Sequence, residues 1–307
     1  MRATVRVPAT SANLGPGFDC LGLALDLYNT VTLEVAAHPT QPYVEVRGEG
    51  HDRLPRNERN LALRSAQRIL QAGARGLSVQ RVALDNNIPV GGGLGSSAAA
   101  IAGGMVAANA AVHPPFATDE LLRMALEFEP HPDNLAAAFY GGLTVAVLDA
   151  GGRPVVAPLA PPPGLRAVVL TPDRGVSTHQ SRAALPHAVT HADAAYTAGR
   201  AALLVAALLT GRHELLRRAM EDRLHQPYRV PEGSPSAAVM AAALEAGASG
   251  AALSGSGPSI LALCAGPTAP VAAAMRACAV RYGLTARARE LTIVAIGATV
   301  TALSESR

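Results

Sequence analysis

Alternating apolar and polar residues at the beginning of the chain predict a pair of antiparallel strands. Residues 1–7 alternate in this way, and residues 30–37 repeat the pattern. The segment 8–22 between them is rich in Gly, Pro and Asn, so we expect a structured loop there. The strand-like beginning also lacks the basic and then apolar pattern of a signal peptide, so export is not expected.

Apolar residues at helical spacing first occur at 61–73, after Asn57 and Asn60, either of which can cap a helix. Further along the first half, the patterns predict a strand at 79–84, a glycine-rich loop at 89–97, helices at 98–112, 119–129 and 135–140, and a strand at 141–148. A strand, a glycine loop and a helix thus follow one another in order.

A segment rich in proline and glycine, residues 149–164, divides the chain. It carries five prolines and three glycines, a composition typical of an interdomain connection. We therefore expect two domains, 1–155 and 156–307, which suits a chain of 307 residues. In the second half the patterns predict strands at 167–170, 249–254, 259–263 and 291–300 and helices at 191–210, 212–224, 234–246 and 268–282. This mixture indicates an α+β or α/β fold.

The composition excludes several classes of protein. With 49% hydrophobic and 16% charged residues, the sequence is that of a folded protein. Its net charge of +3 comes with basic residues that are scattered along the chain, which argues against a nucleic-acid partner. The sequence contains no lysine, so it cannot contain the P-loop of a Walker A ATPase.

Cysteines and apolar runs bear on the compartment. Cys20, Cys264 and Cys278 form no CxxC motif, which argues against a disulfide framework or a zinc site and favours a reducing, cytoplasmic location. The apolar run 201–210 is about half as long as the roughly 20 residues of a membrane span. We therefore expect a buried helix there.

The segment 91–97, Gly-Gly-Gly-Leu-Gly-Ser-Ser, is the strongest local signal for a function. Glycines let backbone N–H groups approach an anion, and the beginning of the next helix adds partial positive charge, so the segment suits a polyphosphate. Ser96 and Ser97 could instead simply cap the helix, or one hydroxyl could bind Mg²⁺. A second segment, Ser-Gly-Ser-Gly-Pro-Ser at 254–259, could be a tight turn, but paired with the first it could close over phosphates from the other domain.

The segment 129–134, Glu-Pro-His-Pro-Asp-Asn, places two carboxylates, an imidazole and an amide at the end of a helix. Asp133 and Asn134 could simply cap the following helix. A phosphoryl-transfer site, however, needs a carboxylate for the metal and polar groups that orient the attacking hydroxyl. Arg182 and Arg229 are candidates for binding an acidic group, although a lone arginine is more often a solvated surface residue.

Three loops in this order resemble those of the GHMP kinases: an N-terminal loop, the phosphate loop at 89–99 and the late Gly-Ser-Gly-Pro-Ser loop. Within that superfamily, residues 8–23, 131–134 and 222–229 are similar to the homoserine kinases. The resemblance covers essentially the whole chain. It implies a two-domain α+β fold, with an N-terminal βαβ nucleotide-binding domain and a C-terminal ferredoxin-like α/β sandwich.

The same resemblance implies an activity: ATP- and Mg²⁺-dependent phosphorylation of the side-chain hydroxyl of L-homoserine to O-phospho-L-homoserine, a step of threonine biosynthesis. ATP would be bound by Asn60, Leu61, Pro89, Val90, Gly91, Gly92, Gly93, Leu94, Gly95, Ser96, Ser97, Ala98, Ala99, Gly255, Ser256 and Gly257. Mg²⁺ would be bound by Ser97 and Glu129.

The implied substrate residues are Asn13, Asp19, Asn134, Thr178, Arg182 and Arg229. Among them, Asn13 and Asp19 would meet the ammonium and hydroxyl ends, Asn134 would hold the reacting hydroxyl, and the two arginines would bind the carboxylate. The implied catalytic residues are Asn134, Asp133 and Glu129. The role of Asp133 as a base stays open, because correct placement of the hydroxyl can suffice.

Two residues depart from the pattern of the homoserine kinases, and two alternative functions stay open. Pro130 follows Glu129 where the family commonly has glycine, and Thr197 stands where relatives often carry asparagine. The chain could be another GHMP kinase that acts on mevalonate, but mevalonate has no ammonium group for Asp19. It could be an inactive nucleotide-binding regulator, but such proteins tend to lose the metal carboxylate or the phosphate loop. Whether the chain forms a homodimer stays open.

Overall fold

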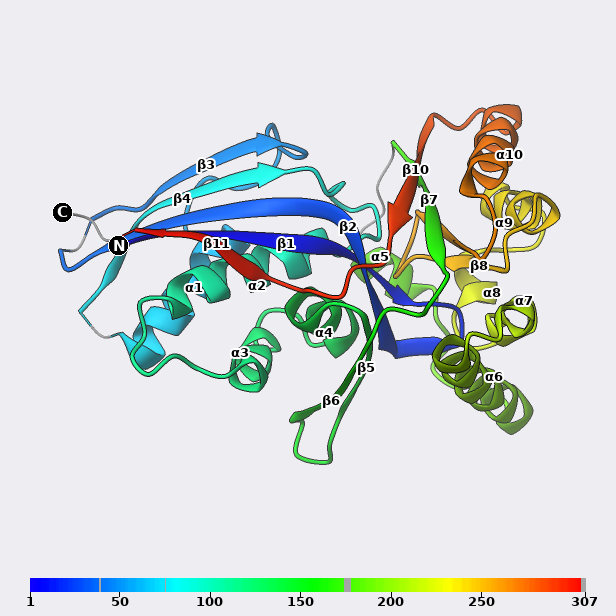
Figure 1. The fold of residues 1–307 in the computed structure, drawn as a ribbon, viewed down its shortest axis with the longest axis horizontal. Coiled ribbons are helices and arrows are strands. Elements are labelled where there is room, and N and C mark those ends of the chain that lie inside the picture. Colours follow the sequence, from blue (N-terminus) through cyan, green and yellow to red (C-terminus); the bar gives the residue numbers. More distant parts are fainter. Residues whose placement is uncertain (39, 75, 174–177, 305–307) are drawn as a thin grey trace.

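The computed structural model describes residues 1–38, 40–74, 76–173 and 178–304, without the side chains of 178–180. The strands are β1 (Arg2–Asn13), β2 (Gly17–Ala36), β3 (Tyr43–Gly48), β4 (Ser78–Asn86), β5 (Leu143–Leu148), β6 (Pro154–Leu159), β7 (Arg166–Pro172), β8 (Gly250–Leu253), β9 (Ile260–Cys264), β10 (Ala286–Thr292) and β11 (Thr299–Ser304). The helices are α1 (Leu61–Gly73), α2 (Ser96–Asn109), α3 (Thr118–Ala125), α4 (Pro132–Tyr140), α5 (Thr178–Ala183), α6 (His191–Thr210), η1 (His213–Leu215), α7 (Leu216–Ala219), α8 (Gln226–Arg229), α9 (Pro235–Glu245) and α10 (Thr268–Arg281). Figure 1 shows that they form two domains side by side.

The first domain is built on a seven-stranded sheet with the order β11-β1-β2-β4-β3, to which β5 and β6 are added beside β2. Strands β1 and β2 form a long antiparallel hairpin whose tip reaches the second domain (Figure 1). Strands β3 and β4 are parallel and are joined through α1. A parallel pair needs such a crossover, so the predicted βαβ unit is confirmed.

Helices α1, α2 and α4 cover one face of this sheet, and α2 is buried between α1 and the strands. Its small residues allow this close approach. A Cβ at Gly103 would lie 2.5 Å from the side chain of Val31, and a Cβ at Gly104 would lie 2.3 Å from the carbonyl oxygen of Ala62. Because α2 is held on both sides, its first turn has a fixed position at the end of the sheet nearest the second domain.

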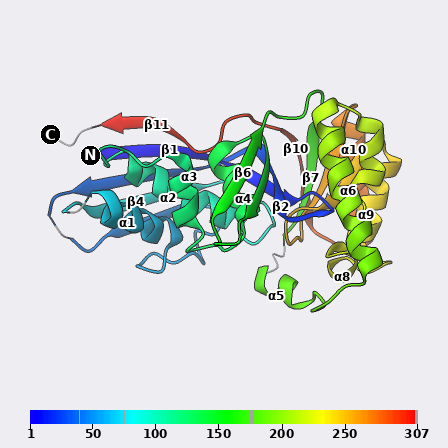
Figure 2. The ribbon, with the colours of Figure 1, turned by 90° about the horizontal axis from the view of Figure 1, so that it is seen from below.

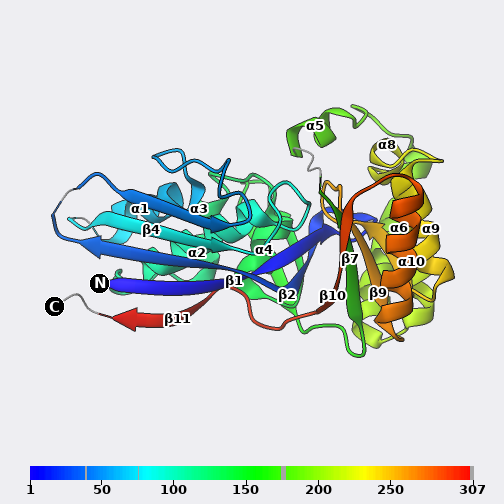
Figure 3. The same cartoon turned by 90° about the horizontal axis from the view of Figure 1, so that it is seen from above.

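The second domain has a four-stranded antiparallel sheet with the order β10-β7-β9-β8. Helices α9 and α10 pack together on one face of this sheet, and Figure 3 shows them on the side away from the first domain. Two βαβ-type halves folded into one antiparallel sheet make the ferredoxin-like α/β sandwich. The predicted fold class is thereby confirmed.

Four predicted elements differ from the structure. The segment 8–22 is not a loop, because β1 and β2 run through it and turn only at residues 14–16. The segment 149–164 contains β6, which pairs with β5. Of the helix expected at 212–224, only the stretch from η1 to α7 is helical. The strand expected at 291–300 is interrupted, so that β10 belongs to the second sheet and β11 to the first.

Helix α6 has the predicted bounds, but the expectation that its apolar run is buried is wrong. Only Thr197, Leu204, Ala207 and Leu208 are buried along it. Alanine dominates the rest of the helix, and this small side chain tolerates exposure. Among the described residues, this helix is also long and apolar enough to cross a membrane, and 22% of its most apolar 18 residues are buried. One such helix is weak evidence for a membrane span.

The predicted domain boundary after residue 155 stays a prediction. Sheet pairing refines it, because β6 continues the first sheet to Leu159 and β11 returns to pair with β1. Helix α5 lies at the junction of the two domains in two perpendicular views (Figures 1 and 2). The junction is where residues from both halves of the sequence meet.

Candidate active site

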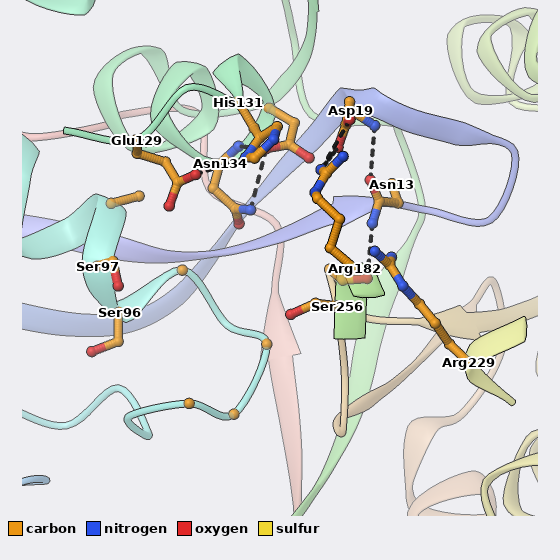
Figure 4. Close-up of a pocket in the computed structure, with 17 residues that line it drawn as sticks. Asn13, Asp19, Ser96, Ser97, Glu129, His131, Asn134, Arg182, Arg229 and Ser256 are labelled. Carbon is orange, nitrogen blue, oxygen red and sulfur yellow. Dashed lines mark hydrogen bonds and ion pairs between the residues drawn. The ribbon is translucent and has the colours of Figure 1, made fainter. Parts of the chain in front are cut away.

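The phosphate loop forms one wall of a pocket between the domains, with about 730 Å³ of empty space including its open mouth. Helix α2 begins at Ser96 after Gly95, and no side chain caps it. The alternative interpretation of the serines as caps is therefore wrong. The backbone N–H groups of a first helical turn have no partner within the helix, and both serines line the pocket (Figure 4).

The second glycine loop touches the first, as the predicted closure over phosphates requires. The Ser254 hydroxyl donates to the carbonyl oxygen of Gly93 over 2.7 Å, and the Ser259 N–H donates to the Gly92 carbonyl over 3.3 Å. A Cβ at Gly93, whose φ is +77°, would lie 2.7 Å from the carbonyl oxygen of Gly257. The loops thus form a continuous backbone surface, and Gly255 and Ser256 complete the pocket wall.

Position 95 is also restricted to glycine. A Cβ there would lie 1.9 Å from the Thr10 hydroxyl oxygen and 3.2 Å from Asn134 Oδ1. The Thr10 hydroxyl itself donates to Asn134 Oδ1 over 2.7 Å. The phosphate loop, strand β1 and the beginning of α4 therefore converge on one amide group.

The beginning of α4 carries the dense polar cluster that the sequence indicated. The helix starts at Pro132 after His131, without a side-chain cap, so the alternative interpretation of Asp133 and Asn134 as caps is wrong. His131 Nδ1 lies 2.8 Å from Glu129 Oε1, and this bond raises the pKa of His131 despite its partial burial. Figure 4 shows Glu129 and Asn134 pointing into the pocket from this corner.

Asp133 lies at the base of the pocket and is 3% exposed. Burial raises the pKa of its carboxyl group to about 6, and the nearby Asp19 adds to the rise. Its Oδ1 accepts the backbone N–H of Asn134 over 2.6 Å and the side-chain amide of Asn134 over 3.3 Å. The Asn134 amide is therefore held from both ends, by Thr10 and by Asp133.

The other end of the pocket carries opposite charges from the two domains. Arg182 Nη2 donates to both carboxylate oxygens of Asp19, over 2.7 and 3.0 Å (Figure 4). The Nε of Arg182 is a buried donor that has no partner among the described residues. A zwitterion could separate this ion pair, with its cationic group bound to the carboxylate and its anionic group bound to the guanidinium group.

Arg229 lies beside Arg182, and both guanidinium groups stack on Phe18, at 5.3 and 5.2 Å from the ring centroid. Burial lowers the pKa of Arg229, and the charge of Arg182 lowers it further. The Nε of Arg229 donates to the carbonyl oxygen of Ser181 over 3.2 Å. Two neighbouring guanidinium groups over one ring favour a bound anion that neutralises them.

Asn13 lines the pocket, but its amide already has partners on the backbone. It donates to the Gly255 carbonyl over 2.8 Å and accepts the Asp19 N–H over 3.0 Å. Asn13 and Asp19 both have positive φ, of 70° and 57°. An asparagine tolerates this region better than most residues. Through its bond to the Asp19 N–H, Asn13 holds Asp19 in place as well as lining the pocket.

The remaining predicted site residues lie elsewhere or outside the description. Asn60 caps α1 by accepting the N–H groups of Ala62 and Leu63, and neither it nor Leu61 lines the pocket. Pro89 and Val90 line an adjoining hollow that shares Gly92 with the pocket. The predicted residues that line neither hollow are Asn60, Leu61, Leu94, Ala99 and Gly257. The side chain of Thr178 lies outside the described residues.

Sequence reasoning missed the residues that support the site. Thr10 and Phe18 belong to the segment 8–22, and His131 to the polar cluster, but none was given a role. His225 was given no role either, although it is fully buried beside Arg229. The available signal was that these residues lie within the three segments that resemble the homoserine kinases.

The residues present fit a magnesium ion that is shared with a nucleotide. The part of the chain that is described contains no group of three or more His, Cys, Asp and Glu that could hold a metal by itself. Mg²⁺ usually takes one or two carboxylates and completes its shell with phosphate oxygens and water. Glu129 and Ser97, which line the same pocket, suit this arrangement. Glu127 does not, because it forms an ion pair with Arg68 on the surface.

A glycine-rich loop before a helix, in a pocket between a βαβ domain and a ferredoxin-like domain, is typical of the GHMP small-molecule kinases. Two family descriptions agree: "GHMP kinases N terminal domain" matches residues 60–142 and "GHMP kinases C terminal" matches residues 204–282.

Individual relatives narrow the class. The chain is 43% identical over 296 residues to the homoserine kinase of Moorella thermoacetica, covering 96% of this chain and 99% of the relative. The crystal structure of homoserine kinase from Cytophaga hutchinsonii has a TM-score of 0.86 at 30% identity and covers 97% of both chains. The mevalonate kinase of L. major, with a TM-score of 0.71, 15% identity and coverage of 95% and 96%, shares the fold alone. The chain belongs to the homoserine kinase family, and it is a kinase.

Proposed function

We propose that this kinase transfers the γ-phosphoryl group of ATP to the side-chain hydroxyl of L-homoserine, with Mg²⁺, and forms O-phospho-L-homoserine for threonine biosynthesis in the cytoplasm. The observation that carries the proposal is the polarity of the pocket. One end is a backbone surface of glycines, and the other end pairs Asp19 with Arg182 beside Arg229. A polyphosphate fits the first end and a small zwitterion fits the second.

The substrate's charges would replace the contacts that the free pocket makes with itself. Its ammonium group would bind the carboxylate of Asp19. Its carboxylate would bind Arg229 and Arg182, including the buried Nε of Arg182. The exchange replaces the one ion pair between Asp19 and Arg182 by ion pairs at both charges of the substrate. An uncharged alcohol would leave Arg182 and Asp19 paired and would gain none of these contacts.

Catalysis then depends on placement. Thr10 and Asp133 fix the amide of Asn134, which holds the substrate hydroxyl toward the phosphate loop. The hydroxyl oxygen forms a bond to the γ-phosphorus while the bond from that phosphorus to the ADP oxygen breaks, and the hydroxyl proton is released to water. A loose transition state demands little of the nucleophile, so orientation supplies much of the rate.

Backbone N–H groups at the beginning of α2 offset part of the charge on the phosphates. When bound, Mg²⁺ would stabilise negative charge that develops on the phosphate oxygens. Glu129 and Ser97 are the residues that would hold it. His131 orients Glu129 through one carboxylate oxygen, Oε1.

The test is an assay of ATP consumption with homoserine, mevalonate, shikimate and galactose, each with and without Mg²⁺. We expect turnover with homoserine alone, dependent on the metal. A preference for mevalonate would overturn the substrate and leave the kinase. No turnover with any alcohol, while ATP still binds, would favour the regulator.

A further inference from the structure

His225 lies beneath the substrate end of the pocket and has no part in the proposed reaction. Its side chain is 0% exposed, and it does not line the pocket. It stacks on Phe18 with ring centroids 5.0 Å apart and planes inclined by 25°. The same Phe18 ring carries the guanidinium groups of Arg182 and Arg229, so His225 belongs to one layered cluster with both arginines.

Each ring nitrogen of His225 makes one hydrogen bond to a described residue, and these two bonds fix its tautomer. Nε2 lies 2.7 Å from the carbonyl oxygen of Gly15, which can only accept. Nδ1 lies 3.2 Å from Nη1 of Arg229, which can only donate. Nε2 must therefore carry the proton and Nδ1 must present its lone pair to the guanidinium group.

Burial of the ring, and not the balance of the nearby charges, favours its neutral form. Burial lowers the pKa of His225, and the positive charge of Arg229 acts in the same direction. The carboxylate of Asp222, the hydrogen bond to the Gly15 carbonyl group and the carboxylate of Asp19 act against it. Asp222, however, accepts the backbone N–H groups of residues 224–226, and its Oδ2 stays 3.6 Å from Nε2. A protonated ring would direct a second N–H at Arg229.

The anchor of the ring comes from the other domain. Gly15 lies at the tip of the β1–β2 hairpin, with φ of +89°, and a Cβ there would lie 2.3 Å from the carbonyl oxygen of Met220. Only glycine lets the hairpin approach this closely, and the approach delivers the carbonyl group to His225. The His225 imidazole thus fixes the position of the Arg229 guanidinium group relative to the domain that carries the phosphate loop.

We infer that His225, as the neutral Nε2–H tautomer, is a positioning residue that aims Arg229 at the carboxylate of the amino-acid substrate. The inference rests on the proposed binding of that carboxylate by Arg229. It assigns His225 no contact with substrate or nucleotide. Its loss should therefore weaken homoserine binding and leave ATP binding and the chemical step nearly unchanged.

Two amide variants separate the two ring nitrogens. His225→Asn places a carbonyl oxygen near Nδ1 and keeps an acceptor for Arg229, whereas His225→Gln places an NH₂ group near Nε2 and keeps the donor to Gly15. We expect KM for homoserine to rise by about 10-fold in His225→Gln, within the range for a hydrogen bond to a charged group. His225→Asn should restore most of it, with kcat and KM for ATP within about 3-fold of the wild type in both variants.

A double-mutant cycle with Arg229→Leu tests the route of the effect. If His225 acts through Arg229, His225→Gln adds nothing to KM for homoserine in the Arg229→Leu background. An undiminished effect there, or a larger defect in His225→Asn than in His225→Gln, overturns the inference and leaves His225 a structural anchor. If Arg229→Leu alone binds homoserine normally, the proposed role of Arg229 fails instead.

Nitrogen-15 NMR of the histidine-labelled wild-type protein at pH 7.5 provides an arm that needs no variant. The assigned His225 signals should show a protonated Nε2 and an unprotonated Nδ1, and ATP should leave them in place. A doubly protonated ring or the Nδ1–H tautomer overturns the inference, whatever the variants do. Thermal unfolding of each variant identifies any rise in KM that comes from loss of folded protein.

Discussion

The two ends of the pocket are built in different ways. The phosphate end consists of backbone from two glycine loops that pack on each other, through Gly93, Ser254 and Gly257. The amino-acid end consists of side chains that bond to one another across the domain junction, chiefly Arg182 with Asp19. Glycines and backbone contacts make the first end sensitive to added volume, and charge pairs make the second sensitive to lost charge.

This difference teaches how one pocket can bind two unlike ligands independently. The phosphate end is already shaped, so ATP needs few rearrangements there. The amino-acid end satisfies its own charges, and only a ligand with both charges can replace them. Variants at each end should therefore affect one ligand and spare the other, with Glu129 and Asn134, between the ends, affecting turnover.

The largest effect is expected where the ends meet. Glu129→Gln removes the carboxylate charge proposed for Mg²⁺ while keeping the shape, and kcat should fall by about 10³-fold with KM for ATP nearly unchanged. Steady-state kinetics against ATP and Mg²⁺ measures both. The matched control is Glu127→Gln, which removes only a surface ion pair with Arg68. A large loss in the control and none at Glu129 would mean that the metal carboxylate has been misassigned.

The next effect breaks the amino-acid end alone. Arg229→Leu leaves the substrate carboxylate without one of its two guanidinium partners, so kcat/KM for homoserine should fall by roughly 10²-fold. KM for ATP should hardly change. Arg217→Leu, at an exposed arginine of the same domain, serves as the control. If Arg229→Leu and Arg182→Leu both use homoserine normally, the homoserine proposal fails and the kinase assignment stands.

A smaller effect, on ATP instead of homoserine, is expected at the phosphate end. At Gly93 an added Cβ would lie 2.4 Å from the carbonyl oxygen of Ser254, and φ is +77°. Gly93→Ala should therefore displace the loop and raise KM for ATP by about 10-fold or more, with KM for homoserine kept within a few-fold. Gly199→Ala is the control, since a Cβ on that exposed helical glycine meets nothing within 4 Å. Equal increases for both substrates would contradict the independence of the two ends.

The two ends also differ in how far the sequence could predict them. The phosphate end follows from contiguous motifs, and α1 was predicted to the residue because its apolar spacing and its Asn60 cap agree. Local signals failed at 8–22, where Gly, Pro and Asn suggested a loop although the strands run on. The Gly, Pro and Asn residues indicate the turn at residues 14–16, but they carry no information about strand pairing on either side of it.

The amino-acid end depends on contacts between distant parts of the chain. Thr10 bonds to Asn134 across 124 positions, and His225 bonds to Gly15 across 210 positions. Spacing within a segment carries no information about such pairs. The resemblance to homoserine kinases supplied Asp19 and gave Arg182 and Arg229 a role, but the partners that orient them became visible only with the packing of the two domains.

Asp133 gives the smallest effect, a dependence of stability on pH. Burial raises the pKa of this carboxyl group from 3.8 to about 6, so the folded protein holds the proton more tightly than the unfolded chain. Between about pH 4 and pH 6 the folded state therefore binds more protons, and stability falls as the pH rises through this window. Above about pH 6 both states are ionised and the contribution becomes constant.

Asp133→Asn keeps the acceptor for the Asn134 N–H and removes the charge. The free energy of unfolding of the variant, measured with urea at pH 4.5 and at pH 7.5, should lose the Asp133 part of the decline, roughly 1–3 kcal/mol. Asp52→Asn, at an exposed aspartate, should keep the full decline of the wild type. Parallel profiles for the wild type and Asp133→Asn would mean that the pocket already solvates this carboxylate. In that case Asp133 would be ionised under the substrate hydroxyl well below pH 6, a state in which it could accept the hydroxyl proton.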